Sequence, residues 1–404
     1  MSYPRHFFFA AALLVLPSTL LANTTLTEAP RAAKVDYQVV SPHGTRNDPY
    51  YWLRDDQRKD PKVLAYLEQE NAWYQQHSSS YQQLTEQLTT EIIGRIKQDD
   101  SSVPYTKGDY QYYSRYETGK EYPIYARKPV AGGDEQILLD VNQLAAGKDF
   151  YQVGNLSVSP DQQLLAYMED LNGRRQYTLK VRDLKTGKDL PDQLTGLSAA
   201  IAWSADSKQL FLVRNDPVTL LSNTVLRHQL GADPAQAQSV YQETDNSFYM
   251  WVSNSQDQRY VMINLSSTVS DEIRILDASQ PAGDFKVLAP RMRDFKYDAE
   301  HLNGRWIIRT DWQAPNYRLM TVAADKLGDR ANWQPLLAHD DNIFIQSFAL
   351  FNDYLAISER SDGLRRIRVM PWQAPEKAFY VKSDEAAYVT GFEMNAEQNT
   401  QLLR

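Results

Sequence analysis

From about Tyr105 onward, apolar and polar residues alternate in short runs that are separated by turn residues. One stretch, residues 157–188, reads SVSPDQQLLAYMEDLNGRRQYTLKVRDLKTGK. Tyr177, Leu179 and Val181 occupy alternate positions in it, and this spacing places side chains on one face of a strand. Three dipeptides between the runs favour chain reversals, with Asn-Gly the strongest short signal for a tight hairpin: Pro160-Asp161, Asn172-Gly173 and Thr186-Gly187. The stretch therefore predicts a small antiparallel sheet of three or four strands.

The same pattern recurs along the chain at a nearly constant interval. The turn aspartates Asp161, Asp206 and Asp257 are separated by 45 and 51 positions, and later copies carry Asn303-Gly304 and Asn352-Asp353 at the turn. Repeats of about 40 to 50 residues with four strands each are typical of β-propellers. A Greek-key sandwich is the alternative, but it would not repeat at a fixed interval.

We therefore predict a mainly β chain that forms a seven-bladed β-propeller with an incomplete last blade. The seventh blade would begin at Tyr388 with VTGFEM, shortly before the last residue, Arg404. The six preceding blades are expected at Tyr105–Ala145, Gly147–Thr195, Leu197–Glu243, Ser247–Met292, Phe295–His339 and Ile343–Ser383.

A different periodicity ahead of the strand-rich region predicts two amphipathic helices. Asp60-Pro61 suits the N-cap and first turn of one helix, and the residues after it share roughly one face: Val63, Leu64, Leu67 and Trp73. Ser78 to Ser80 offer a second cap. Apolar residues then recur every three or four positions: Tyr81, Leu84, Leu88, Ile92 and Ile96. Two such helices in an otherwise strand-like chain need a surface to cover.

The N-terminus has the pattern of a secretory leader. Arg5 and His6 precede an apolar run from Phe7 to Leu16, which is too short to span a bilayer, and Ala22 is the expected last leader residue. We expect a signal peptide over residues 1–22, a helical extension over 23–98 and the propeller over 99–404. The protein would be periplasmic or secreted, with a membrane-tethered leader as the alternative.

The charge and the cysteine content limit the binding partners and the catalytic chemistry that we expect for the chain. With 43 Lys and Arg against 51 Asp and Glu, the net charge is −8, so there is no basic excess to bind nucleic acid or an anionic membrane. We expect neither partner. Cysteine is absent, which excludes disulfides and thiol catalysis.

No motif for catalysis, cofactor binding or metal binding stands out in the sequence. The nearest match to a Gly-x-Ser-x-Gly nucleophile elbow is GLSAA, Gly196 to Ala200, which lacks the second glycine, so Ser198 is interpreted as a loop serine. None of the six histidines has metal-ligand spacing: His6, His43, His77, His228, His301 and His339. Three pairs of adjacent acids are interpreted as turns or caps: Asp55-Asp56, Asp99-Asp100 and Asp340-Asp341. We expect no catalytic, cofactor-binding or metal residue, and leave substrate-binding residues unassigned.

Several long segments, in order, resemble the oligopeptidase B (protease II) branch of the prolyl oligopeptidase family of serine peptidases. They are DPYYWLRDD, VLAYLEQENAWY, GRIKQDDSSVPY, YYSRYETGKEYPIYARK, SPDQQLLAYMEDLNG, VLRHQLG, NYRL, ISERSDGLRRIRVMPW and NTQLLR. Together they cover roughly residues 36–404.

The resemblance implies a function for the whole family member rather than for this segment. In that family a propeller caps an α/β-hydrolase domain, admits short peptides by size, and the enzyme cleaves after Arg or Lys. The family's Ser, Asp and His would lie beyond residue 404, and the helical extension would pack on the hydrolase domain. These 404 residues alone are then expected to be inactive. The alternative is a stand-alone propeller that acts as a binding or inhibitory module.

Overall fold

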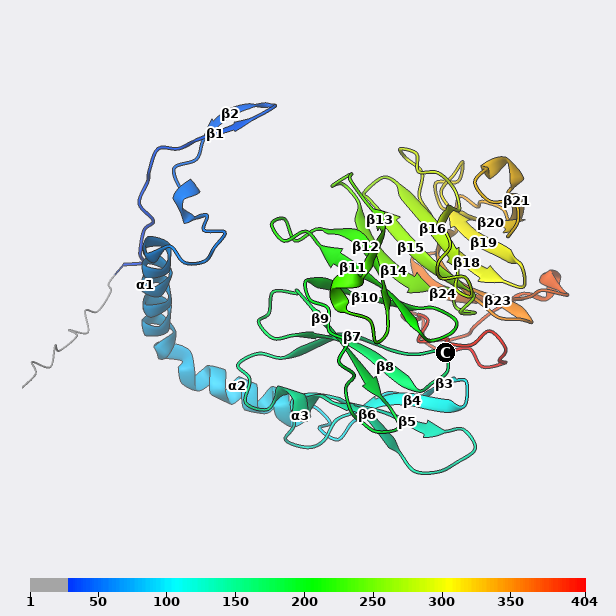
Figure 1. The fold of residues 1–404 in the computed structure, drawn as a ribbon, viewed down its shortest axis with the longest axis horizontal. Coiled ribbons are helices and arrows are strands. Elements are labelled where there is room, and N and C mark those ends of the chain that lie inside the picture. Colours follow the sequence, from blue (N-terminus) through cyan, green and yellow to red (C-terminus); the bar gives the residue numbers. More distant parts are fainter. Residues whose placement is uncertain (1–27) are drawn as a thin grey trace, which may run out of the picture. The chain divides into compact units, whose positions relative to one another are not determined.

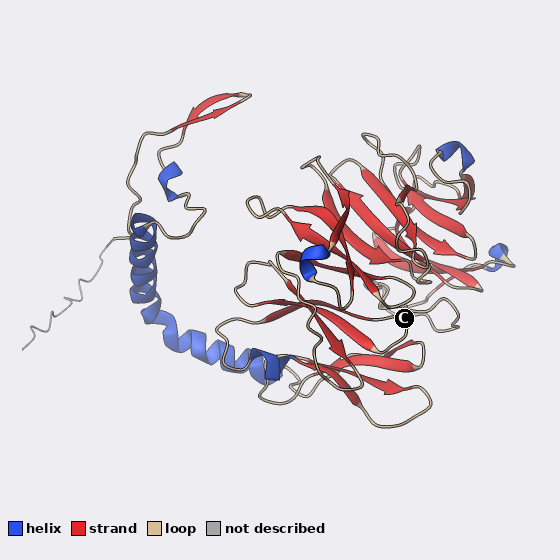
Figure 2. Cartoon of the chain, viewed as in Figure 1, coloured by secondary structure: helices blue, strands red, loops and turns tan. Residues whose placement is uncertain are grey.

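The computed structural model describes residues 28–404, so the predicted signal peptide over 1–22 lies outside the described residues. The chain divides into two compact units, with the boundary between Lys97 and Gln98. The two long helices belong to the first unit and the large sheets to the second (Figure 2). None of the helices described between residues 28 and 404 is long and apolar enough to cross a membrane.

The first unit consists of a hairpin and two consecutive helices. Its elements are β1 (Gln38–Ser41), β2 (Gly44–Asn47), the 3-10 turns η1 (Tyr51–Leu53) and η2 (Ser79–Tyr81), and the helices α1 (Pro61–Ser78) and α2 (Gln82–Arg95). The predicted cap of α1 is confirmed, because the Asp60 carboxylate accepts a hydrogen bond from Lys62 N at 2.8 Å. Asp60 thereby satisfies one of the backbone donors that a helix N-terminus leaves unpaired.

The serines between the helices do not cap α2, contrary to the sequence prediction. The hydroxyls of Ser78, Ser79 and Ser80 donate backwards to carbonyls near the end of α1, and the N-cap of α2 is Tyr81, without a side-chain bond. Ser78 and Ser79 both keep right-handed helical dihedral angles. The backbone therefore stays helical through Ser79, and the interruption before α2 falls at Tyr81, with φ −119° and ψ 11°, rather than at a serine.

The apolar face predicted for α2 is present and open to solvent. Leu84, Leu88, Ile92 and Ile96 are all exposed, with exposed fractions of 46% to 60%, and α2 contains no buried residue. Unlike the strands of the second unit, this helix has no core of its own to stabilise it.

The second unit is built from six antiparallel sheets, each formed by consecutive strands (Figure 1). We number them in chain order: sheet 1, β3 (Tyr105–Lys107), β4 (Tyr110–Arg115), β5 (Ile124–Pro129), β6 (Gln136–Asp140); sheet 2, β7 (Gln152–Val158), β8 (Leu164–Asp170), β9 (Thr178–Asp183); sheet 3, β10 (Leu197–Trp203), β11 (Gln209–Asn215), β12 (Ser222–Gln229), β13 (Gln238–Gln242); sheet 4, β14 (Tyr249–Asn254), β15 (Tyr260–Ser266), β16 (Asp271–Asp277), β17 (Lys286–Val287); sheet 5, β18 (Tyr297–Leu302), β19 (Arg305–Thr310), β20 (Arg318–Ala323), β21 (Gln334–Leu337); sheet 6, β22 (Phe344–Leu350), β23 (Tyr354–Ser361), β24 (Leu364–Pro371), β25 (Phe379–Tyr380). Each of the six predicted blades contains one sheet, and in sheet 2 an Arg182–Asp189 bridge takes the place of a fourth strand. Short helical turns lie between strands: α3 (Val141–Ala145), η3 (Pro234–Gln236), η4 (Arg330–Asn332) and η5 (Pro375–Lys377).

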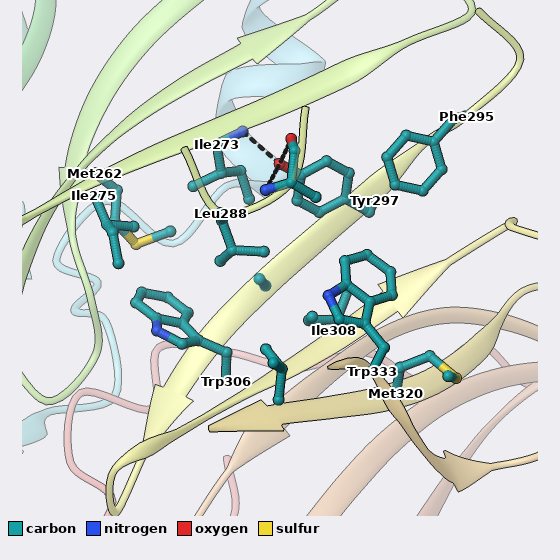
Figure 3. Close-up of a cluster of buried hydrophobic side chains, with 13 residues drawn as sticks. Met262, Ile273, Ile275, Leu288, Phe295, Tyr297, Trp306, Ile308, Met320 and Trp333 are labelled. Atoms are coloured by element: carbon teal, nitrogen blue, oxygen red, sulfur yellow. Dashed lines mark hydrogen bonds between the residues drawn. The ribbon is translucent and has the colours of Figure 1, made fainter. Parts of the chain in front are cut away.

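The hydrophobic core lies between successive sheets rather than within any one of them. Five clusters each combine residues of two neighbouring sheets, as expected for blades packed face to face around a ring. Between sheets 4 and 5, the ring of Tyr297 lies against those of Phe295 and Trp333, and Ile273 and Trp306 belong to the same buried cluster (Figure 3). The buried hydroxyl of Tyr297 donates to Ala289 O at 2.9 Å and accepts from Ile273 N at 2.8 Å. Residues 28–404 contain no parallel sheet flanked by helices, and hence no α/β-hydrolase domain.

Three hairpins between the first and second strands of a sheet share one hydrogen-bonded turn. In each turn a serine hydroxyl donates to the aspartate two residues later, at 2.5 to 2.7 Å, in the pairs Ser159–Asp161, Ser204–Asp206 and Ser255–Asp257. The residue after each aspartate has a positive φ, between 60° and 62°, at Gln162, Ser207 and Gln258. The aspartates that revealed the repeat are thus the acceptors that hold these turns.

The Asn172-Gly173 pair does not form the predicted two-residue hairpin. Strand β8 ends at Asp170 and β9 begins only at Thr178. The buried carboxylate of Asp170 accepts from the backbone nitrogens of Asn172, Gly173 and Arg175, at 2.7 to 3.1 Å. The loop is therefore wound around this carboxylate, which outweighs the local preference for a tight turn.

The strand predicted from Tyr388 is not formed, and residues 381–404 contain no strand. A first strand with no second strand beside it has no ladder partner, so its backbone groups find other partners. Asn352 N donates to Gln398 O, and Glu393 N donates to Arg404 O. Two apolar side chains of this C-terminal segment cover the face of sheet 6 around Phe351 and Tyr354: Phe392 and Leu403.

Candidate functional site

A serine, an aspartate and a histidine meet between sheets 4 and 5, but not in the order of a catalytic triad. Asp257 bridges the other two: Ser255 Oγ donates to its Oδ1 at 2.7 Å, and His301 Nδ1 lies 2.6 Å from its Oδ2. In a triad the histidine stands between the serine and the aspartate, where it can take the serine proton. The other ring nitrogen of His301, Nε2, is buried without a partner in the described chain. The three residues therefore hold the turn and join two sheets.

The other candidates from the sequence also have structural roles. His228 Nε2 lies 2.7 Å from Asp192 Oδ1, and both side chains are almost fully buried. Ser198 lies on the first strand of sheet 3, β10, so its interpretation as a loop serine was wrong. Its only hydrogen bond in the described chain is accepted from Ala200 N at 3.4 Å. Residues 28–404 contain no group of acidic and histidine side chains that could hold a metal ion.

The acidic doublets serve as local caps where the structure gives them hydrogen bonds. Asp55 accepts from the backbone nitrogens of Gln57 and Asp60, and Asp340 accepts from Asn342 N at 2.8 Å. The backbone hydrogen bond from Asp60 is the largest cause of the lowered pKa of Asp55. These carboxylates are occupied by the chain's own backbone and are poorly placed for general acid–base chemistry.

A polar cavity lies where the first strands of several sheets converge. It has a volume of about 350 Å³ and is lined by residues of β3, β4, β7, β14 and β18, of the turn between β14 and β15, and of the C-terminal segment: Tyr105, Lys107, Tyr112, Leu156, Ser157, Val158, Asn254, Ser255, Gln256, Gln258, Glu300, Met394, Asn395 and Ala396. Because the first strands line the central channel of a propeller, we call it the channel-mouth cavity. A second cavity shares Lys107, Tyr112 and Gln256 with it and continues toward Glu397 and Asn352.

Glu300 is the acidic residue of the channel-mouth cavity. Its Oε1 accepts two backbone hydrogen bonds, from Gln256 N at 3.0 Å and from His301 N at 2.8 Å. No hydrogen bond or ion pair within residues 28–404 reaches Oε2. Desolvation raises the pKa of Glu300 to about 7, and the nearby carboxylates of Asp257 and Asp298 add to the rise against the two backbone bonds. Glu300 is thus a fixed carboxyl group without a cation.

Lys107 brings the opposite charge to the same cavity. It is the last residue of β3 and is partly buried, and desolvation lowers the pKa of its ammonium group. Within the described part of the chain its Nζ takes part in no ion pair or hydrogen bond. The cavity therefore contains one basic and one acidic side chain, neither of which has a charged partner in the described chain.

Asp298 lies two residues before Glu300 on β18, on the same face of the strand, but it is paired. Arg309 Nη1 lies 2.6 Å from Asp298 Oδ1, and the guanidinium also donates to Ile345 O and stacks on the ring of Tyr317. Desolvation still raises the pKa of Asp298 to about 6, although the contact with Arg309 opposes the rise. Asp298 therefore differs from Glu300 in having its charge neutralised.

The sequence held a signal for the acids of β18 that we did not use. In YDAEHL, residues 297–302, the buried Tyr297, Ala299 and His301 alternate with Asp298 and Glu300, so both acids share the opposite face. Their meeting with Lys107, in contrast, depends on how six sheets close into a ring, and no local pattern records it.

Comparisons with a family profile, with curated proteins and with solved structures all relate the chain to the same group of peptidases. A family profile described as "Prolyl oligopeptidase, N-terminal beta-propeller domain" matches residues 30–404. Dipeptidyl aminopeptidase BI from Pseudoxanthomonas mexicana is 44% identical over 97% of this chain, and Protease 2 from Moraxella lacunata is 30% identical over 81% of it. Among solved structures, oligopeptidase B from Leishmania major covers 93% of this chain with a TM-score of 0.87 and 28% identity.

These relatives are longer than the chain. The aligned region is 57% of the Pseudoxanthomonas protein, 48% of the Moraxella protein and 57% of the Leishmania structure. The chain therefore spans about half the length of the proteins it matches.

Proposed function

The chain belongs to the prolyl oligopeptidase family, whose N-terminal β-propeller domain it forms, and we propose that it is the substrate-gating part of a serine peptidase that hydrolyses short peptides. The observation that carries this proposal is the match over residues 30–404 to a domain of peptidases that extend well beyond it. The catalytic serine, histidine and aspartate are placed outside these 404 residues. The misordered group around Asp257 supports that placement.

For the substrate, we propose short peptides cleaved after Arg or Lys. The likeness to structures of oligopeptidase B supports this choice, as do the carboxyl groups of Asp298 and Glu300 on the first strand of sheet 5. Carboxylates that line a channel attract cationic peptides electrostatically and slow the entry of anionic peptides.

A second candidate is removal of dipeptides from a free N-terminus. It is favoured by the name of the Pseudoxanthomonas relative, a dipeptidyl aminopeptidase, at 44% identity. The two candidates differ in one respect that is easily tested: an N-terminally acetylated peptide remains a substrate for an oligopeptidase but not for an aminopeptidase.

The gating proposal can be tested with a chimera. Residues 30–404 would replace the aligned part of the Pseudoxanthomonas enzyme, and cleavage of Arg-containing peptides of increasing length would be compared with the parent enzyme. Acetylated and free peptides in the same series separate the two candidates. We expect an active chimera that discriminates against long peptides. A chimera that folds, cleaves short peptides and accepts a folded protein equally well would refute gating by this propeller.

For the location, we propose the periplasm or the outside of the cell, based on the leader pattern over residues 1–22. Cell fractionation with N-terminal sequencing of the mature chain tests it. A stand-alone binding or inhibitory module stays the alternative to the gating role, and an inert chimera beside a tightly binding free chain would favour it.

A further inference from the structure

Two unpaired charges of opposite sign line the channel-mouth cavity. Glu300 Oε2 and Lys107 Nζ have no charged or hydrogen-bonded partner in the described chain, although both side chains are partly buried in the wall of the cavity. Holding an unpaired charge away from water costs free energy, and proteins normally pair such groups. The other acids near this cavity have partners: Asp298, which is exposed, pairs with Arg309, and the partly buried Asp257 pairs with His301.

We propose that the channel-mouth cavity binds a short peptide with free termini, its ammonium group at Glu300 and its carboxylate at Lys107. Such a zwitterion brings both missing partners at once. A simple amine or a simple carboxylic acid would satisfy only one of the two groups and leave the other charge unpaired.

The rest of the lining is a fixed polar and aromatic surface. The side-chain amides of Asn254, Gln256, Gln258 and Asn395 are held by hydrogen bonds to other groups of the chain, and Tyr105 and Tyr112 provide apolar surface. A volume of about 350 Å³ lies at the lower end of the range of small-molecule sites, roughly 300 to 1,000 Å³. The site therefore favours a dipeptide or tripeptide over a longer chain.

Glu300 is also prepared for an ammonium group. The backbone nitrogens of Gln256 and His301 fix Oε1, so Oε2 is presented in one orientation before any ligand arrives. A preorganised acceptor binds more tightly because little freedom is lost on binding. In the proposed peptidase such peptides are the products, so the identity of the ligand rests on that function. The binding itself is measured on this chain without catalysis.

The test uses isothermal titration calorimetry of the 404-residue chain with three probes: Ala-Ala, N-acetyl-Ala-Ala and Ala-Ala amide. We expect Ala-Ala to bind, and each blocked peptide to bind at least about tenfold more weakly, because each loses one charge-assisted contact. Binding of a blocked peptide as tightly as Ala-Ala would overturn the proposal, and so would the absence of Ala-Ala binding at millimolar concentration. Both outcomes leave the gating role of the propeller open.

Variants assign the two contacts. Glu300→Gln should weaken the binding of Ala-Ala at least about tenfold and leave the binding of N-acetyl-Ala-Ala unchanged. Lys107→Met should also weaken the binding of Ala-Ala at least about tenfold, and it should leave the binding of Ala-Ala amide unchanged. Glu376→Gln and Lys377→Met, on the exposed turn η5, are the matched controls and should have no effect. Unchanged Ala-Ala affinity in both cavity variants would contradict the proposal. If a variant fails to fold, the three probes on the wild-type chain still decide it.

Discussion

The guanidinium group of Arg404 donates hydrogen bonds to two consecutive carbonyls three hundred residues earlier, Pro104 O at 2.6 Å and Val103 O at 2.8 Å. These carbonyls directly precede β3, the first strand of sheet 1. The same C-terminal segment covers sheet 6, so Arg404 links the first and last sheets of the row. No strand pairing joins these two sheets in the described residues.

Replacing Arg404 by Ala should loosen this link. We expect a loss of about 1 kcal/mol in the free energy of unfolding, because two hydrogen bonds from a charged donor are removed at a partly exposed site. Amides of β3 and β4 should exchange faster with deuterium. Arg293→Ala, at a highly exposed side chain whose one ion pair within residues 28–404 is with its neighbour Asp294, should change neither property. Unaltered exchange in sheet 1 would show that the link contributes no stability.

The contact between Asp257 and His301 should make stability depend on pH in the acid range. Desolvation raises the pKa of Asp257, but hydrogen bonds from His301 and Ser255 outweigh it, and the pKa falls below its usual 3.8. A carboxylate with a lowered pKa stabilises the fold above about pH 4, and this contribution disappears as the pH falls through the lowered value. Asp257→Asn should therefore cost about 1 to 3 kcal/mol at pH 7 and progressively less below pH 4.

Urea denaturation across pH 2 to 8 measures this prediction. Asp284→Asn, at an exposed aspartate with no hydrogen bond in the described chain, is the control and should follow the wild type throughout. A constant difference between Asp257→Asn and wild type at every pH would mean that the loss is one of packing and not of charge.

Glu300 should have the opposite effect on stability. Its pKa rises from 4.5 to about 7, mainly through desolvation, so the folded chain binds a proton more tightly than the unfolded chain. Stability from this group is complete below about pH 4.5 and is lost as the pH rises toward 7. Glu300→Gln keeps an oxygen acceptor for Gln256 N and His301 N but never ionises. It should stabilise the chain by on the order of 1 to 3 kcal/mol at pH 8 and change little at pH 4. Thermal unfolding at the two pH values decides; a variant less stable than wild type at pH 8 would be evidence against the unpaired charge.

The exposed apolar face of α2 should cause association of the isolated chain. We expect oligomers by light scattering, and Leu88→Glu should shift them toward the monomer, because a charge on this face opposes its burial against a second molecule. Thr90→Glu, roughly 200° further around the helix, is the matched control and should leave association unchanged. A wild-type chain that is monomeric at high concentration would contradict this expectation.

The 404-residue chain should not hydrolyse peptides. In subtilisin, loss of the catalytic residues costs about a millionfold in kcat even though the oxyanion hole is kept. An Arg-containing chromogenic peptide incubated with purified chain should give the rate of the buffer blank, with the chimera as positive control. Hydrolysis that copurifies with the chain and disappears with a serine-directed inhibitor would prove the prediction wrong.

The sequence predicted the repeating part of the fold well, because its signals act over a few residues. Asp60-Pro61 marked the start of α1, and the alternation of Leu179 and Val181 with polar neighbours gave the faces of β9 correctly. The prediction failed where two local interactions compete. The hydroxyls of Ser78 to Ser80 can either cap α2 or donate to carbonyls of α1, and the path of the backbone determines which interaction forms.

The candidate site was beyond sequence reasoning for a different reason. Lys107 and Glu300 are far apart in the chain, and although the alternation in β18 marks Glu300, nothing local connects it with Lys107. Their shared cavity arises from the curvature of the whole row of sheets. The opposite situation is found at Asp257, which bridges Ser255 and His301. The three residue types are those of a catalytic triad, but their hydrogen bonds run in the wrong order.

Because each apolar cluster is shared by two successive sheets, the stability of the ring is a sum of couplings between neighbours. A sheet in the middle of the row is coupled on both sides. Sheet 6 has a full neighbour on one side and only Phe392 and Leu403 on the other. Local unfolding should therefore begin at sheet 6 and proceed toward the middle of the row. The cluster around Trp306, between sheets 4 and 5, should unfold late.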